Sequence, residues 1–246
     1  MRDLGIASGL GGRVPSPAGA IIVAAGESTR MDGIDKIFTP VLGKPLIAHT
    51  LEPFLSSPLI AEVVLVLHPS SMEQGQELLH SNGWTRVKVV PGGKRRQDSV
   101  WNGLQVLPRQ EWVVVHDGAR PCLDEELIDK GLRTAQETGA AIAAIPARDT
   151  MKEVDLLGMV VRTHDRDRLT IVQTPQVFRR ALLEEAFSHG QQTVTDEATM
   201  VEVLGRSVKT FMGSYANIKV TTPEDLIMAE IILARRRNLR TGSGES

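Results

Sequence analysis

The feature that most constrains the fold of this chain is a regular alternation of short apolar segments with longer segments of helical periodicity. The apolar segments are rich in β-branched residues, as buried strands of parallel sheets are, and cover Ala20–Ala25, Glu62–Leu67, Arg86–Val90, Trp112–His116 and Ala140–Ile145. The segments with helical periodicity cover Lys44–Ser56, Ser70–Ser81, Arg95–Leu107 and Asp124–Thr138. This alternation predicts an α/β fold, a three-layer α/β/α sandwich with helices on both faces of a mostly parallel sheet.

The pattern is interrupted at about residues 146–173, which are charged and rich in turn-forming residues. This stretch predicts a protruding β-hairpin arm rather than a helix that covers the sheet. The alternation then resumes, with helices expected over Val177–Ser188 and Asp196–Leu204 and a strand over Ser207–Met212. A last helix is expected to begin at Thr222-Pro223-Glu224-Asp225, which combines an N-cap, a proline at the first helical position and two early carboxylates.

The length of 246 residues suits one large domain, which we place at 19–240. Residues 1–18 are rich in Gly, Ser and Pro and are expected to form a flexible extension, and residues 241–246 a flexible tail.

Composition narrows the possible partners. The net charge of -2 gives no reason to expect nucleic acid. No apolar run approaches the roughly 20 residues needed to cross a bilayer, so no membrane association is expected. The single cysteine, Cys122, excludes an intramolecular disulfide and a cysteine-based zinc site, and it predicts a cytoplasmic location.

Ligands of open α/β sheets bind at the carboxyl ends of the strands, near a switch in strand order. The first predicted strand ends in Ala24-Ala25-Gly26, followed by Arg30 and Lys36. Small residues let backbone N–H groups approach an anion, and the two cations add charge. The segment is equally compatible with a plain strand-to-helix connection.

A second candidate lies in His116-Asp117-Gly118-Ala119-Arg120-Pro121, after another apolar strand. Asp117 is well placed to hold Mg²⁺, which prefers one or two carboxylates together with phosphate oxygens. The alternative is that Asp117 caps a turn. A cationic loop and an acidic one on nearby strand ends are what a magnesium-bound triphosphate requires.

A third candidate is Gly92-Gly93-Lys94-Arg95-Arg96-Gln97-Asp98-Ser99, a glycine turn that leads into a helix. It is either a solvated helix start or an anion site. Cations are unfavourable in the first turn of a helix unless an anion lies nearby, which favours a ligand.

Together these motifs resemble the 2-C-methyl-D-erythritol 4-phosphate cytidylyltransferase family of the non-mevalonate isoprenoid pathway. The resemblance covers Ala20 to about Arg236 and also rests on five further motifs in the expected order. These are Asp149-Thr150-Met151-Lys152, Asp165-Arg166, Gln173-Thr174-Pro175-Gln176, Thr195-Asp196-Glu197-Ala198 and Asn217-Ile218-Lys219-Val220-Thr221.

The resemblance implies a Rossmann-like nucleotidyltransferase sheet, CTP and a polyol phosphate as substrates, and Mg²⁺ as cofactor. It implies that Arg30, Lys36 and Lys219 act on the reacting phosphate, and that Asp117 holds the metal. The implied nucleotide-binding residues are Ala24, Ala25, Gly26, Gly93, Arg96, Ser99 and Gly118. The implied acceptor-binding residues are Arg166, Thr174 and Thr195. It also implies a homodimer whose arm reaches the neighbouring subunit, so that Arg166 serves the partner's site.

The resemblance leaves two alternatives open. Many relatives carry an acidic residue where this chain has Ala216, so the acceptor could be another polyol phosphate, such as ribitol 5-phosphate. An alternative of another class is a non-catalytic nucleotide-binding regulatory protein, but such a protein would be expected to lose Lys36, Asp117 or Lys219, and all three are present.

Overall fold

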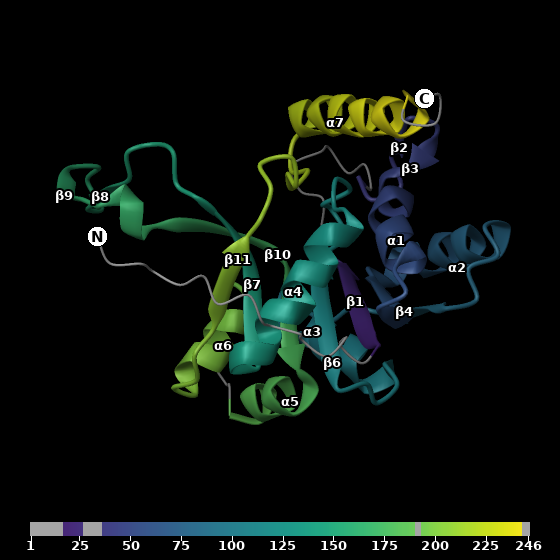
Figure 1. Ribbon diagram of the computed structural model, residues 1–246, viewed down its shortest axis with the longest axis horizontal. Coiled ribbons are helices and arrows are strands. Elements are labelled where there is room, and N and C mark those ends of the chain that lie inside the picture. Colours follow the sequence, from purple (N-terminus) through teal and green to yellow (C-terminus); the bar gives the residue numbers. More distant parts are fainter. Residues whose placement is uncertain (1–16, 27–35, 190–192, 243–246) are drawn as a thin grey trace, which may run out of the picture.

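The computed structural model describes residues 17–26, 36–189 and 193–242, with the side chains of residues 240–242 left out. The described part has a central sheet of seven strands flanked by helices (Figure 1). From one edge to the other, the strands are β11 (Lys209–Met212), β7 (Ala140–Pro146), β10 (Thr170–Arg179), β6 (Trp112–Asp117), β1 (Ala18–Ala24), β4 (Ile60–Leu67) and β5 (Val87–Pro91). All neighbouring pairs are parallel except those that β10 makes with β6 and β7.

Helices cover both faces of the sheet, because side chains along each strand point alternately to opposite sides. One apolar cluster joins the sheet to α1 (Leu46–Ser56), α2 (Met72–Ser81) and α4 (Glu125–Thr138). A second joins the opposite face to α3 (Arg96–Val106), α5 (Arg180–His189) and α6 (Glu197–Val203). The expected three-layer α/β/α sandwich is therefore confirmed.

The last helix, α7 (Pro223–Gly242), lies across one end of the sandwich (Figure 1). It packs on a small cluster that includes Cys122, next to a short pair of strands, β2 (Pro40–Val41) and β3 (Lys44–Pro45). None of the helices in the described part of the chain combines the length and the apolar character that a bilayer span requires.

The protruding arm is also confirmed (Figure 1). It contains the antiparallel pair β8 (Lys152–Val154) and β9 (Val160–Thr163), and a 3-10 turn, η2 (Arg166–Arg168). Every residue of β8 and β9 is exposed, which distinguishes these strands from the buried strands of the sheet.

The expected helix over Val177–Ser188 is wrong at its start, because these first residues belong to β10, a strand that was not expected from the sequence. Val177 and Phe178 belong to β10 and pair with Val114 and Val113 of β6, and the helix begins only at Arg180. Val177 and Phe178 are buried in opposite apolar clusters. Because both faces of this strand are covered, its apolar residues do not alternate with polar ones, and a short apolar run reads equally well as a helix.

The strand order defines where a ligand can bind. From β1 the chain passes outward to β4 and β5, and then returns to place β6 on the other side of β1. In open α/β sheets, the crevice for ligands lies outside the carboxyl ends of the strands at such a switch in strand order, which here is at β1 and β6. Another 3-10 turn, η1 (Pro69–Ser71), follows β4 at the same end.

Candidate active site

A cleft of about 730 Å³ lies at this crevice. It gathers nine of the residues that the sequence indicated: Ala24, Ala25, Gly26, Lys36, Gly93, Arg96, Ser99, Asp117 and Lys219. These residues come from the ends of β1 and β6, the loop after β1, the glycine turn after β5, the start of α3 and the segment before α7. Residues nearly two hundred positions apart in the chain thus share one cleft.

Two glycines allow the loops at the cleft to pack closely. A Cβ on Gly118 would lie 2.7 Å from the Cβ of Ala24, and a Cβ on Gly92 would lie 2.2 Å from the Cβ of Ala25. The N–H of Gly118 donates to the carbonyl of Val23 at 2.8 Å. Gly118 does not line the cleft in this structure, and its contribution is this contact between the ends of β1 and β6.

The glycine turn before α3 is held by Ser99. The Ser99 hydroxyl accepts a hydrogen bond from the N–H of Gly93 at 3.1 Å and donates to the carbonyl of Arg95 at 3.2 Å. The Asp98 carboxylate accepts from the N–H of Arg95 at 3.1 Å. The turn is thus preorganised, with Lys94, Arg95 and Arg96 all lining the cleft.

Asp117 is the electrostatic centre of the cleft. Its Oδ1 lies 3.3 Å from Nη2 of Arg96, and its Oδ2 lies 3.3 Å from Nε of Arg120 and 3.0 Å from Nζ of Lys219. Burial alone would raise the pKa of Asp117, but the three cations outweigh it and hold the pKa well below its ordinary value. The carboxylate therefore stays ionised, as a metal ligand must.

His116 and Thr174 fix the backbone at Asp117. The N–H of Asp117 donates to Oγ1 of Thr174 at 3.0 Å, so the Thr174 hydroxyl is oriented to donate to Nδ1 of His116, 2.9 Å away. Nε2 of His116 then carries the proton that it donates to the carbonyl of Arg120 at 3.3 Å. Burial lowers the pKa of His116 to about 4, so the ring is neutral at pH 7 and braces the strand end.

A buried polar network places Lys219 beside Asp117. Nδ2 of Asn217 donates to the carbonyl of Thr174 at 2.7 Å, and Nη1 of Arg120 donates to the carbonyl of Asn217 at 2.8 Å. Gln173 donates to the carbonyl of Ser214 at 2.9 Å. Arg120, Gln173 and Asn217 belong to the motifs quoted from the sequence, but no role was expected for them, whereas Thr174 was expected to bind the acceptor. Polar residues inside otherwise apolar strand ends are the signal that could have indicated them.

The residues expected to bind the acceptor are not gathered around this cleft. Thr174 is only 4% exposed, and its hydroxyl is used in the bonds to Asp117 and His116. Thr195 is exposed and precedes α6. Arg166 is exposed on the arm, where it donates to the carbonyl of Arg148 at 3.2 Å. Arg30 lies outside the described residues.

The Asp117 carboxylate suits Mg²⁺ if a bound substrate supplies phosphate oxygens as further ligands. Within the described residues, no group of three or more His, Cys, Asp or Glu side chains forms a metal site. Mg²⁺ does not need one, because it commonly binds one or two carboxylates together with phosphates and water. Asp117 would be its protein ligand.

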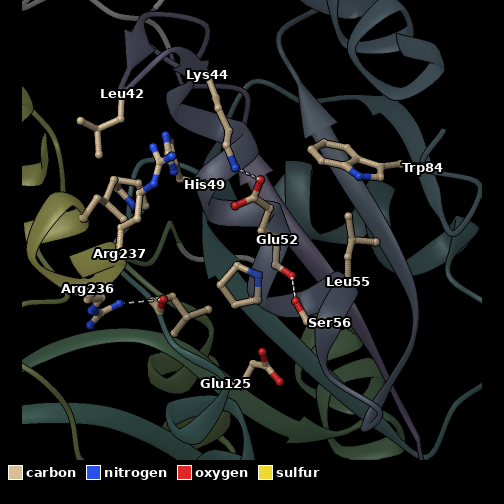
Figure 2. Close-up of a pocket in the computed structure, with 14 residues that line it drawn as sticks. Leu42, Lys44, His49, Glu52, Leu55, Ser56, Trp84, Glu125, Arg236 and Arg237 are labelled. Carbon is tan, nitrogen blue, oxygen red and sulfur yellow. Dashed lines mark hydrogen bonds and ion pairs between the residues drawn. The ribbon is translucent and has the colours of Figure 1, made fainter. Parts of the chain in front are cut away.

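A second cavity, of about 760 Å³, lies between α1 and α7 and shares no lining residue with the cleft (Figure 2). Its cations are engaged within the protein: Lys44 pairs with Glu52, and Arg236 donates to the carbonyl of Leu123 at 2.9 Å. This cavity lacks the glycine turns and the central carboxylate of the cleft.

The fold alone does not define an activity, but the residues of the site narrow the class of protein. A mostly parallel sheet carries, at its switch point, two small-residue loops, several cations and one ionised aspartate. This combination suits a nucleoside triphosphate and is typical of a nucleotidyltransferase.

Comparison with known proteins identifies the family. Residues 18–235 match the family described as IspD, 2-C-methyl-D-erythritol 4-phosphate cytidylyltransferase. A protein of that name from Dehalococcoides mccartyi is 48% identical over 220 residues, which cover 89% of this chain and 97% of the relative. One from Alkaliphilus oremlandii is 41% identical and covers 92% of this chain and 98% of the relative.

Solved structures agree with this assignment. The crystal structure of 4-diphosphocytidyl-2C-methyl-D-erythritol synthase from Anaerococcus prevotii has a TM-score of 0.79 and 31% identity, covering 89% of this chain and 96% of that one. The cytidylyltransferase from Thermus thermophilus has a TM-score of 0.72 and 31% identity, covering 87% and 98%. The chain belongs to the 2-C-methyl-D-erythritol 4-phosphate cytidylyltransferase family, and it is an enzyme of the cytidylyltransferase class.

Proposed function

We propose that this enzyme transfers CMP from CTP to 2-C-methyl-D-erythritol 4-phosphate, giving 4-diphosphocytidyl-2-C-methyl-D-erythritol and pyrophosphate. Family membership supports both substrates. The observation that carries the proposal in the structure is the convergence of Lys36, Asp117 and Lys219 on one cleft. The single cysteine supports a cytoplasmic setting for the reaction.

The reaction is an in-line displacement at the α-phosphorus of CTP. A phosphate oxygen of the acceptor forms the new P–O bond, and the bond from the α-phosphorus to the bridging oxygen of pyrophosphate breaks. The second pKa of a phosphate monoester is about 6, so the nucleophile is largely ionised at neutral pH and needs no general base. This agrees with the buried, neutral state of His116, which leaves it unsuited to proton transfer.

The barrier is mainly the repulsion between two anions and the charge that grows on the transferred phosphoryl group. Preorganised cations lower such a barrier without reorganising during the reaction. Lys36 and Lys219, together with Arg30, would supply them. Asp117 would hold Mg²⁺, which neutralises charge on the triphosphate. The small-residue loop at Ala24–Gly26 and the turn held by Ser99 would bind the nucleotide.

We further propose that the active form is a homodimer in which the arm completes the neighbouring site. The arm exposes a group of large apolar side chains, and such patches mark interaction surfaces. They include Leu156, Leu157, Met159, Val160 and Val161, exposed by 60% or more. Arg166 lies on the same arm and does not line its own cleft, which supports its assignment to the partner's acceptor site.

A pyrophosphate-release assay tests the substrates. With Mg²⁺ present, each of CTP, ATP, GTP and UTP is combined with methylerythritol phosphate and with ribitol 5-phosphate. Rapid release is expected only from CTP with methylerythritol phosphate. Release with ribitol 5-phosphate but not with methylerythritol phosphate would show that the acceptor is another polyol phosphate and that the protein is still a cytidylyltransferase. Absence of release with every pair, from protein that still binds CTP, would favour a regulatory role.

A further inference from the structure

Glu197, the first residue of α6, is a completely buried carboxylate that does not line the cleft itself. It forms an ion pair with Nη1 of Arg96, which lies 101 positions earlier in the chain. Its other oxygen, Oε1, has no hydrogen-bond partner among the described residues. A buried charge of this kind is costly unless it is paired and hydrogen-bonded.

The N-cap of α6 is supplied by the residue before Glu197. That residue is Asp196, whose Oδ1 accepts from the N–H of Thr199 at 3.0 Å and from its hydroxyl at 2.7 Å. The other oxygen of Asp196 accepts from Gln176 at 2.8 Å. Glu197 lies in the first turn of α6, where a carboxylate is favourable, and the long-range partner of its charge is Arg96.

The Arg96 guanidinium is shared between two carboxylates. Nη1 pairs with Glu197, and Nη2 lies 3.3 Å from Oδ1 of Asp117. That second distance is longer than the roughly 2.7–2.9 Å of a close charge-assisted hydrogen bond. Glu197 therefore holds Arg96 at the glycine turn and limits its approach to Asp117.

This restraint on Arg96 matters because the cations around Asp117 outnumber the carboxylates. Three cations, Arg96, Arg120 and Lys219, contact Asp117, and Glu197 is the second carboxylate of the group. Without the Glu197 charge, three cations would compete for one carboxylate. Arg96 would then close on Asp117 and leave its position in the lining of the nucleotide cleft.

We propose that Glu197 is a positioning residue that holds Arg96 in place for the nucleotide and keeps it from closing on Asp117. It does not touch the substrates itself. The inference rests on the proposed function, because it assumes that the cleft binds CTP. It adds a residue of α6 to a site otherwise built from the loops after β1, β5 and β6 and from Lys219.

The test is isothermal titration of CTP in the presence of Mg²⁺ and without acceptor, so that no turnover occurs. Glu197→Gln keeps the size of the side chain and removes its charge, and it is expected to weaken CTP binding about tenfold. Glu202→Gln is the matched control, since it makes the same chemical change at an exposed position of the same helix. It is expected to bind CTP like the parent.

A double-mutant cycle separates positioning from a general structural effect. If Glu197 acts through Arg96, Glu197→Gln causes no further loss of CTP affinity in an Arg96→Ala background. Additive losses would overturn the proposal, as would parent-like affinity of Glu197→Gln. Circular dichroism and Tm monitor folding. If Glu197→Gln does not fold, Glu197→Asp, which keeps the charge but shortens the reach, takes its place in the same cycle.

Failure of the proposed function gives a different result. In that case the parent itself does not bind CTP or does not release pyrophosphate with any acceptor. A parent that binds CTP, together with an indifferent Glu197→Gln variant, overturns only the role of Glu197.

Discussion

At the scale of single residues, the site brings oppositely charged side chains together, and a buried charge among them would be costly without its partners. Asp117 is nearly buried, and its ionised state depends on the cations around it. Arg120, one of these cations, also binds the carbonyl of Asn217, so it ties the carboxylate to the segment that carries Lys219. Arg120 therefore both stabilises the charge of Asp117 and holds the backbone segment that carries Lys219.

Lys36→Ala is expected to lower kcat by roughly a hundredfold to a thousandfold, the usual cost of removing one preorganised donor to a developing charge. Steady-state pyrophosphate release measures the loss. Lys88→Ala, at an exposed position of β5, is the control and is expected to keep the parent's rate. Near-normal turnover of the Lys36 variant would remove Lys36 from the mechanism.

Asp117→Asn is expected to weaken metal binding, because an amide is a poorer ligand for Mg²⁺ than a carboxylate. The Mg²⁺ concentration for half-maximal activity should rise, and added Mg²⁺ should restore part of the activity. Asp129→Asn, on the surface of α4, controls for the chemical change. An Asp117 variant with the parent's Mg²⁺ dependence would show that another group binds the metal.

At the scale of elements, the cleft depends on close contact between the ends of neighbouring strands. The loops after β1 and β6 touch at Ala24 and Gly118, where a Cβ on Gly118 has no room. The alternation of side chains along β6 matters as well. It places Asp117 on the same face as Val115 and Val113, the face covered by α3, so the carboxylate meets Arg96.

Gly118→Ala is expected to lower the free energy of unfolding by about 1–3 kcal/mol, the usual cost of forcing extra atoms into a packed site. Denaturant unfolding followed by circular dichroism measures it. Gly26→Ala is the control for stability, because a Cβ there meets no described atom within 4 Å. Equal free energies of unfolding for the two variants would mean that the contact between β1 and β6 adjusts to the added Cβ at little cost.

At the scale of the whole molecule, the proposed function requires the arm of one subunit to reach the cleft of another. The arm lies between β7 and β10 in the chain, and its strands β8 and β9 extend away from the sheet (Figure 1). Arg166 belongs to η2 of this arm. The residues proposed to bind the nucleotide line the cleft of a single chain. The proposed dimer would bring Arg166 and these residues together.

Subunit complementation tests this arrangement. Lys36→Ala and Arg166→Ala are each expected to be weakly active as homodimers. After unfolding and refolding of an equal mixture, about a quarter of the parent's activity should return, because half the dimers are mixed and each has one intact site. Light scattering verifies the dimer. Mixtures no more active than their components would place Arg166 and Lys36 in the same subunit's site.

The sequence by itself determined the layers, most of the strands and the composition of the nucleotide loops. These features are local: apolar runs, helical periodicity, caps and glycine turns are set by neighbouring residues. Only the tertiary structure decided that Val177 and Phe178 belong to an antiparallel strand, because their burial on both faces comes from helices distant in sequence. It also decided that the Thr174 hydroxyl accepts a hydrogen bond from Asp117, and that Glu197 pairs with Arg96, which lies 101 positions earlier in the chain. Such contacts depend on how the elements pack, which no local pattern records.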